Sequence, residues 1–185
     1  HTNTTLSKQN MHETAGLPPF LKQHLNAERF SMNLIIPTGS ALANEIHLLQ
    51  YSEAGEVIRK INAAALLHGV EFMWYSPTPL CIFNTITEGL GNKGCAACDG
   101  LLSVDPAGNI LPCSSWDEPL GNLITHDFNT IWFSARATEI RNKKSAPEVC
   151  TGCDSLAICQ GACPLFYRAN SNDDCHLLKA RKSNI

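Results

Sequence analysis

Charged and aromatic side chains are scarce in this chain. Asp, Glu, Lys and Arg make up 17% of its 185 residues, Phe, Trp and Tyr make up 7%, and the formal net charge is −3. A short basic tail lies at 179–182, which is typical of a solvated chain end rather than a nucleic-acid site. No apolar stretch approaches the roughly 20 residues of a membrane span, and no signal peptide is visible. We therefore predict no nucleic-acid partner, no membrane insertion and a cytoplasmic location.

Several catalytic motifs are also missing. The sequence contains no glycine-rich phosphate loop and no Ser, His and Asp in the arrangement of a catalytic triad. Its seven histidines are scattered and show no ligand spacing, so they predict no metal site. These absences leave the cysteines as the main carriers of chemistry.

Nine cysteines are present, and seven of them form one ordered array. Cys98 is followed by nine residues, Gly108, four residues and Cys113. A second run has the spacing C-x2-C-x5-C-x3-C, with a last cysteine after eleven further residues. Thiolates at such close spacing are typical ligands of zinc, copper(I) and iron–sulfur clusters. In chain order the nine are Cys81, Cys95, Cys98, Cys113, Cys150, Cys153, Cys159, Cys163 and Cys175.

Disulfides are the alternative use of these cysteines. The odd count, the C-x2-C pair and the lack of an export signal argue against them, because disulfide frameworks belong to oxidising compartments and use even numbers of cysteines. Metal or cluster ligation is the better interpretation. Structural zinc stays open at this point, since zinc modules also use C-x2-C pairs. The Cys163-Pro164 pair, however, matches the end of a bacterial ferredoxin run.

Eight thiolates are enough for two four-ligand sites. In two-cluster ferredoxins the last cysteine of a run ligates the other cluster, so the two sites interlock. By this logic, one predicted site consists of Cys150, Cys153, Cys159 and Cys175. The other would contain Cys163, Cys113 and two of Cys81, Cys95 and Cys98, among which Cys95 is the firmest candidate.

The first 75 residues alternate between strand-like and helix-like patterns. Apolar, β-prone runs at 2–6, 29–36 and 70–75 predict strands. Helical patterns span 9–26, broken near Gly16, and 52–68, with Ser52 as N-cap and Gly69 as the stop. The predicted buried helix faces are Phe20, Leu21 and Leu25 in the first helix, and Val57, Ile58, Ile61, Ala65 and Leu66 in the second. Such alternation predicts βαβ units in a parallel sheet, whose functional groups gather at the carboxyl ends of the strands.

Beyond residue 80, cysteine, glycine and turn residues dominate. Residues 100–113 predict a β-hairpin, with strands at 101–104 and 110–111 around an Asp-Pro-Ala-Gly-Asn turn. Residues 130–142 predict a helix, and loops held by thiolates are expected from Cys150 onward. The expected fold is therefore α/β, with a sheet-and-helix domain at 1–80 and a small cysteine-rich, loop-rich domain at 81–185.

In order and spacing, the array resembles that of the C-terminal part of radical S-adenosylmethionine (SAM) enzymes with a SPASM domain. The motif residues are Cys98-x9-Gly108-x4-Cys113, or Cys95-x12-Gly108-x4-Cys113, then Cys150-x2-Cys153-x5-Cys159-x3-Cys163 and Cys175. The sequence between the cysteines is also similar to that of the family, in the segments SVDPAGNILPCSS, PLGNL, TIWFS and CQGACP. Residues 1–80, including NTTLSKQN and FSMNLIIPTG, resemble the last strands and helices of the family's partial (β/α)6 barrel.

This resemblance implies a radical mechanism in the parent enzyme. A [4Fe–4S] cluster in the barrel cleaves SAM reductively, and the 5′-deoxyadenosyl radical takes a hydrogen atom from a peptide, a protein or a small-molecule cofactor precursor. The cysteines of this chain would bind two auxiliary [4Fe–4S] clusters, and a flavodoxin or ferredoxin would supply electrons. Asn33, Pro37, Thr38 and Gly39 lie at the end of a predicted strand and are candidates to contact SAM or substrate, although turn geometry explains them equally well.

The chain departs from the family in three respects, one of which is an excess of cysteines, since Cys81, Cys95 and Cys98 compete for two places. No three cysteines have the C-x3-C-x2-C spacing that binds the radical-generating cluster, so SAM cleavage and a third [4Fe–4S] cluster are expected of a longer parent. Sulfatase-maturating relatives carry an Asp directly after the cysteine matching Cys113, whereas Ser114 stands here and Asp117 is out of register. The alternatives are a standalone electron-transfer or binding module and a zinc-stabilised scaffold. No catalytic residue is assigned.

Overall fold

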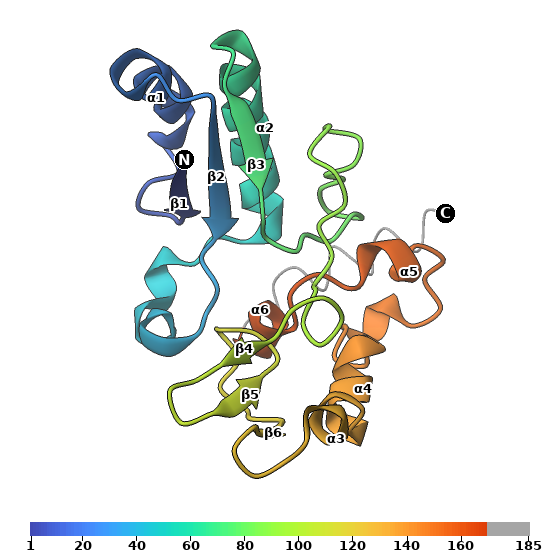
Figure 1. Cartoon of the computed structure of the whole chain (residues 1–185). Coiled ribbons are helices and arrows are strands. Elements are labelled where there is room, and N and C mark those ends of the chain that lie inside the picture. The colour runs from blue at the N-terminus through green and yellow to red at the C-terminus, as the bar shows by residue number, and fades with distance from the viewer. Residues whose placement is uncertain (170–185) are drawn as a thin grey trace.

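The structure is a computed structural model that describes residues 1–169, apart from the side chains at 45, 46 and 169. A three-stranded parallel sheet with its helices forms one part of the molecule, and a small antiparallel sheet with several short helices forms the other (Figure 1). The predicted α/β architecture with a parallel sheet and a cysteine-rich region is confirmed.

The parallel sheet has the strand order β1-β2-β3. Its strands are β1 (Thr2–Leu6), β2 (Arg29–Leu34) and β3 (Glu71–Trp74). The connecting elements are η1 (Thr14–Gly16), α1 (Leu17–Leu25), η2 (Gly39–His47) and α2 (Tyr51–Leu67). All three predicted strands are present, and the last two end one or two residues earlier than predicted.

The two faces of this sheet differ in chemistry, because successive residues of a strand point to opposite sides. One face is apolar and buried, and it consists of Leu6, Phe30, Met32, Leu34, Phe72 and Trp74. The other face is polar: the Asn3 amide donates to Ser31 Oγ at 2.9 Å, and the Asn33 amide donates to Asn3 Oδ1 at 3.1 Å. Parallel sheets usually carry apolar residues on both faces. Only one face here is therefore built for a hydrophobic core.

Helix α1 starts at the predicted break rather than before it. Pro18 and Pro19 occupy its first turn, where the missing N–H groups would be unsatisfied in any case. Asn26 ends the helix in a left-handed conformation with φ of 45°. The predicted buried face is wrong in part, since Leu21 is buried but Phe20 and Leu25 are 51% and 57% exposed.

Helix α2 begins two residues earlier than the predicted N-cap implies. Gln50, not Ser52, is the N-cap, and its backbone N–H donates to the Glu53 carboxylate at 3.0 Å. Gly69, with φ of +61°, follows the end of the helix as expected. Four of the five predicted core positions are buried, whereas Leu66 is 76% exposed and was assigned to the core wrongly.

The cysteine-rich part contains more regular structure than the sequence predicts. Its strands β4 (Ser103–Val104), β5 (Asn109–Leu111) and β6 (Gly121–Asn122) form an antiparallel sheet, of which only the β4–β5 hairpin was predicted. Its helices are α3 (Phe128–Trp132), α4 (Ala135–Arg141), η3 (Glu148–Cys150), α5 (Leu156–Cys159) and α6 (Pro164–Ala169). The predicted helix at 130–142 is thus two helices, because Ser134 Oγ accepts the Ala137 N–H at 3.2 Å and caps a new one.

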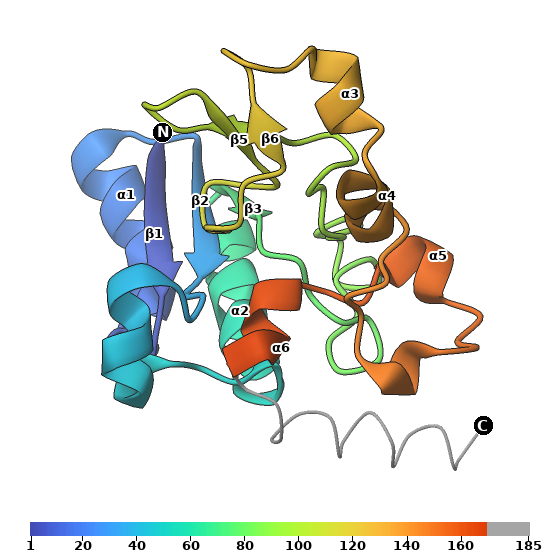
Figure 2. The same cartoon turned by 90° about the horizontal axis from the view of Figure 1, so that it is seen from below.

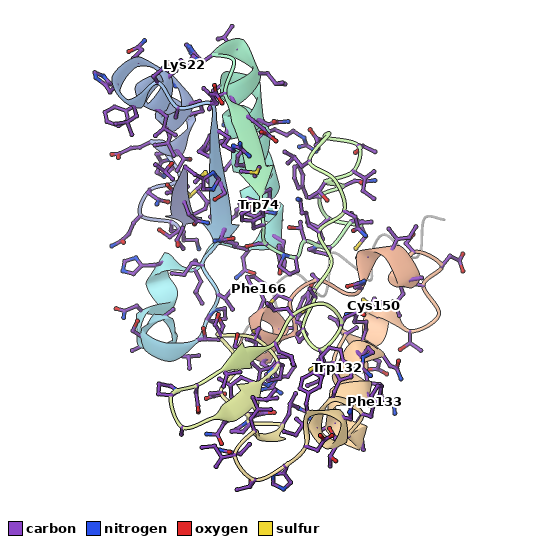
Figure 3. The ribbon with its side chains drawn as sticks, viewed as in Figure 1. Lys22, Trp74, Trp132, Phe133, Cys150 and Phe166 are labelled. Atoms are coloured by element: carbon purple, nitrogen blue, oxygen red, sulfur yellow. The ribbon has the colours of Figure 1, made fainter. Side chains whose placement is uncertain are left out.

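One hydrophobic core joins the two parts. Tyr51 at the start of α2 packs on Phe166 of α6 with ring centroids 4.3 Å apart, and Figure 2 shows α6 beside α2. Phe166 lies where the sheet meets the cysteine-rich part, below Trp74 in Figure 3. The division of domains at residue 80 stays a prediction. Among residues 1–169, no helix is long and apolar enough to cross a membrane.

The exposure of Leu66 yields a matched test of the core of α2. Ile61 is fully buried and Leu66 is 76% exposed. We expect Ile61→Ala to lower the free energy of unfolding by about 2–5 kcal/mol, and Leu66→Ala to change it by less than about 0.5 kcal/mol. Urea unfolding of the two variants measures both values. Equal losses would contradict this packing.

Candidate metal centre

Four cysteines from distant parts of the chain form a first thiol group. It consists of Cys95 and Cys98 in the loop before β4, Cys113 after β5, and Cys163 before α6. Cys98 and Cys163 are buried, and the other two are half-buried. Burial, followed by the charges of Cys95 and Cys113, raises the pKa of Cys163 to about 11. The same two neighbours also act on Cys98, so the four sulfurs share one electrostatic environment.

A tight turn presents the first two of these thiols. The backbone N–H groups of residues 99, 100 and 101 all donate to the Ala96 carbonyl, at 2.9–3.0 Å. Cys98 has φ of +55°, a conformation that is uncommon for residues other than glycine. The end of α4 holds the turn from outside, because Arg141 Nε donates to the Cys98 carbonyl at 2.8 Å and Lys143 Nζ donates to the Cys95 carbonyl at 2.6 Å. Two cations therefore lie against the first thiol group.

The other described cysteines form a second thiol group, which consists of Cys81, Cys150, Cys153 and Cys159. Burial raises the pKa of Cys81 to about 11, and the charges of Cys159, Cys150 and Cys153 add to that effect. The N–H of Leu80 donates to Cys159 Sγ at 3.4 Å, which brings the start of the 79–94 segment to this group. No disulfide joins any two of the eight cysteines within residues 1–169.

The two thiol groups show which of the candidate cysteines lie near Cys113. The structure places Cys95, Cys98 and Cys163 with it, and places Cys81 with the second thiol group instead. The predicted crossover of Cys163 agrees with this arrangement, although ligation itself stays a prediction. Cys175, the predicted fourth member of the other site, lies outside the described residues.

The donor set consists of two groups of four thiols. In the described part of the chain, no three Cys, His, Asp or Glu side chains converge closely enough to hold one metal ion. A tetrahedral zinc ion, with Zn–S bonds of about 2.3 Å, requires sulfurs about 3.8 Å apart. A four-iron cluster holds its cysteine sulfurs farther apart, because the irons and sulfides lie between them. Four cysteine thiolates are also the number of ligands that a [4Fe–4S] cluster takes, and each thiol group contains four.

A cavity of about 510 Å³ separates the first thiol group from the carboxyl edge of the parallel sheet. Asn33 and Thr38 line it from one side, and Cys95, Cys113 and Cys163 line it from the other. The edge is well ordered by hydrogen bonds, since Leu34 N–H donates to Ser76 Oγ at 2.6 Å and Trp74 Nε1 donates to Thr78 Oγ1 at 2.8 Å. The cavity therefore connects the polar face of the sheet to the thiols.

A second cavity of about 500 Å³ adjoins the first and shares four lining residues with it: Thr38, Ser114, Ser115 and Leu165. Pro37 and Gly39 line this outer cavity, together with Asp117 and Arg168. All four sequence-predicted contact residues thus border one of the two cavities. Ser114, which replaces the Asp of sulfatase-maturating relatives, borders both, whereas Asp117 borders only the outer one.

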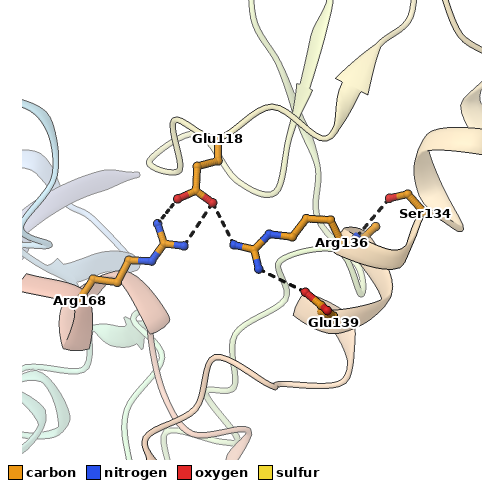
Figure 4. Close-up of polar contacts among 6 residues, drawn as sticks. Glu118, Ser134, Arg136, Glu139 and Arg168 are labelled. Atoms are coloured by element: carbon orange, nitrogen blue, oxygen red, sulfur yellow. Dashed lines mark hydrogen bonds and ion pairs between the residues drawn. The ribbon is translucent and has the colours of Figure 1, made fainter.

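A network around Glu118, which the sequence analysis missed, supports the rim of the outer cavity (Figure 4). The Glu118 carboxylate accepts hydrogen bonds from Arg168 at 2.7 and 3.3 Å and from Arg136 at 2.9 Å. The Arg168 guanidinium also stacks 4.6 Å from the centre of the buried Trp116 ring. These contacts, that with Arg168 first, lower the pKa of Glu118 from its usual 4.5 to about 2. No local sequence pattern could have revealed these contacts, since Arg136 and Arg168 lie 18 and 50 positions after Glu118 in the sequence.

Comparison with known families identifies the region that carries the thiols. Residues 95–154, about a third of the chain, match SPASM, an iron–sulfur cluster-binding domain. No curated protein and no solved structure matches the chain. The matched region includes Cys95, Cys98 and Cys113 of the first thiol group and Cys150 and Cys153 of the second. The chain therefore contains a SPASM domain, and the predicted resemblance is confirmed for this region.

The Glu118 network predicts a pH-dependent contribution to stability. The folded-state pKa is lowered, so the contribution is fully present above the unfolded pKa of about 4.5 and is lost as the pH falls toward about 2. Because Glu118 is half-exposed, we expect Glu118→Gln to cost only about 0.5–1 kcal/mol at pH 7.

Urea unfolding followed by tryptophan fluorescence, from pH 8 down to pH 3, measures this difference. Glu139→Gln is the control, since Glu139 contacts Arg136 alone in this network at 3.4 Å, and it should cost less. A difference between wild type and Glu118→Gln that grows as the pH falls below 4.5 would reverse the expected sign.

Proposed function

We propose that this chain is the C-terminal part of a radical SAM enzyme with a SPASM domain. In this role it binds two auxiliary [4Fe–4S] clusters that support radical modification of a peptide, a protein or a cofactor precursor. The observation that carries the proposal is the position of the first thiol group, which faces the carboxyl edge of a parallel sheet across a cavity of about 510 Å³. Functional groups of barrel and open α/β folds gather at that edge.

Each thiol group would hold one cluster. The first would use Cys95, Cys98, Cys113 and Cys163, and the second would use Cys150, Cys153, Cys159 and one further thiol. When bound, such clusters take up and release single electrons at potentials set by nearby charge and solvent exposure. Arg141 and Lys143 lie against the first thiol group and offset the negative charge of its thiolates.

The cavity suits a polar ligand. Its volume is within the usual range of about 300–1,000 Å³ for small-molecule sites. Asn33 provides an amide, and Thr38, Ser76, Ser114 and Ser115 provide hydroxyl groups. These groups would orient a substrate segment or SAM by hydrogen bonds, and the wall formed by Cys95, Cys113 and Cys163 would keep it near the first cluster. The polar face of the sheet, with Asn3 and Ser31, would form the inner wall of the partial barrel.

The second thiol group lies closer to the surface. Cys81 is exposed, Cys150 and Cys153 are half-buried like Cys95 and Cys113, and Cys159 is buried. An electron donor such as flavodoxin or ferredoxin would therefore dock on this side of the molecule. A standalone electron-transfer module is the second candidate function, and it is favoured by the restriction of the family match to residues 95–154.

Metal and sulfide analysis tests the proposal. After anaerobic purification and reconstitution, we expect about eight irons and eight sulfides per chain, as two [4Fe–4S] clusters require. One or two zinc ions without sulfide would contradict the proposal and leave a zinc-stabilised scaffold.

A further inference from the structure

Two cations at the end of α4 contact the turn that carries Cys95 and Cys98 (Figure 1). Arg141 Nε donates to the Cys98 carbonyl at 2.8 Å, and Lys143 Nζ donates to the Cys95 carbonyl at 2.6 Å. Each cation therefore binds the peptide carbonyl of a cysteine in the first thiol group. Because a carbonyl oxygen carries no formal charge, these bonds fix the positions of both cations without neutralising them.

Helix α3 also holds the Arg141 guanidinium. Its Nη2 donates to the Trp132 carbonyl at 2.9 Å, and its central carbon lies 4.5 Å from the centre of the Trp132 ring. In the described part of the chain, no Asp or Glu forms an ion pair with Arg141. Among residues 1–169, the charge of Arg141 is thus fixed in place and has no carboxylate to compensate it.

Lys143 occupies a backbone position that is typical of glycine. It follows α4 with φ of +56°, and the N–H groups of Lys143 and Lys144 donate to carbonyls in the last turn of that helix at 3.0 and 3.1 Å, as in a Schellman motif. A side chain other than that of glycine disfavours this left-handed conformation. The Lys143 side chain is only 13% exposed, and it also contacts Asp99 Oδ2 at 3.5 Å. A less favourable backbone conformation thus places an ammonium group against the cysteine turn.

We propose that Arg141 and Lys143 raise the reduction potential of the cluster bound by the first thiol group. This inference rests on the proposed function, because it presumes a [4Fe–4S] cluster at that group. When an external reductant adds one electron, the cluster and its thiolates become more negative by one charge, and nearby charge sets the potential. Fixed cations in a partly buried site stabilise the more negative state, since they act through a lower dielectric than that of water. Asp99 acts in the opposite sense, because its carboxylate lies beside Lys143.

Redox titration of the reconstituted protein with dithionite, followed by EPR spectroscopy, tests this proposal. We expect Arg141→Gln and Lys143→Gln each to lower the equilibrium constant for reduction of one of the two clusters by about tenfold, which is about 59 mV for a one-electron couple. Asp99→Asn should shift the same potential in the positive direction, since it removes the carboxylate beside Lys143. Lys144→Gln is the matched control. It removes the same charge from the next residue, which is exposed, and should leave both potentials nearly unchanged, because water and salt screen an exposed charge.

A conservative variant separates the charge of Arg141 from its shape. Arg141→Lys keeps the cation but loses the planar guanidinium that bonds to two carbonyls, so it should recover most of the potential lost in Arg141→Gln. Equal shifts in Arg141→Lys and Arg141→Gln, with no positive shift in Asp99→Asn, would show a merely structural role and overturn the proposal.

Iron and sulfide analysis of every variant accompanies the titration and should give about eight of each. If Arg141→Gln loses iron, the opposite shifts expected of Lys143→Gln and Asp99→Asn decide the question alone. Unchanged potentials in these two variants at full iron content would overturn this inference and leave the proposed function intact. Wild-type protein without iron would instead refute the proposed function itself.

Discussion

The cysteine-rich part of the structure brings thiols together in buried positions, where the thiolate form of Cys81 and Cys163 is disfavoured. Burial and the charges of neighbouring thiolates raise the pKa of both Cys163 and Cys81 to about 11. Without a cation, Cys81 and Cys163 would therefore stay protonated at neutral pH. Bound iron would supply the missing positive charge, so that cluster binding and folding become one coupled process. The loops that carry the cysteines are short and would gain much of their order from this coupling.

The two thiol groups are connected to the rest of the molecule in different ways. The first borders the cavity at the sheet edge, and α4 contacts its loop through Arg141 and Lys143. The second is held by the 79–94 segment and α5, where the Leu80 N–H donates to Cys159 Sγ and the Asn92 amide donates to the Ile158 carbonyl. A nearby positive charge favours the reduced, more negative state of a cluster. Under the proposed function, Arg141 and Lys143 would therefore favour the reduced state of the first cluster, which would lie next to the cavity.

The parallel sheet could be predicted because its signals are local. Apolar strands alternate with a helix that Gly69 ends, and these features survive in the structure. The helix at 130–142 was predicted as one helix because no glycine or proline interrupts it in the sequence, while the Ser134 hydroxyl caps a new helix in the structure. Leu66 was misassigned because periodicity alone does not show where the covered face of α2 ends.

The candidate site was predictable in composition but not in geometry. Cysteine spacing identified the SPASM region, since ligand spacing is set by the turns that carry the thiols. It could not show that Cys81 lies with the second thiol group, because that depends on how the 79–94 segment packs on α5. The Glu118 network was equally invisible, since it joins three residues through tertiary contacts alone.

The most direct test of this account is the iron content of double cysteine variants, because it shows which thiols share a cluster. Cys113 and Cys163 belong to one group although Cys163 is adjacent in sequence to the other. The double variant Cys113→Ser/Cys163→Ser should therefore keep about four irons, the same as either single variant. Cys113→Ser/Cys153→Ser should keep almost none. Near-complete iron loss in the first double variant would contradict the division of the cysteines into these two groups.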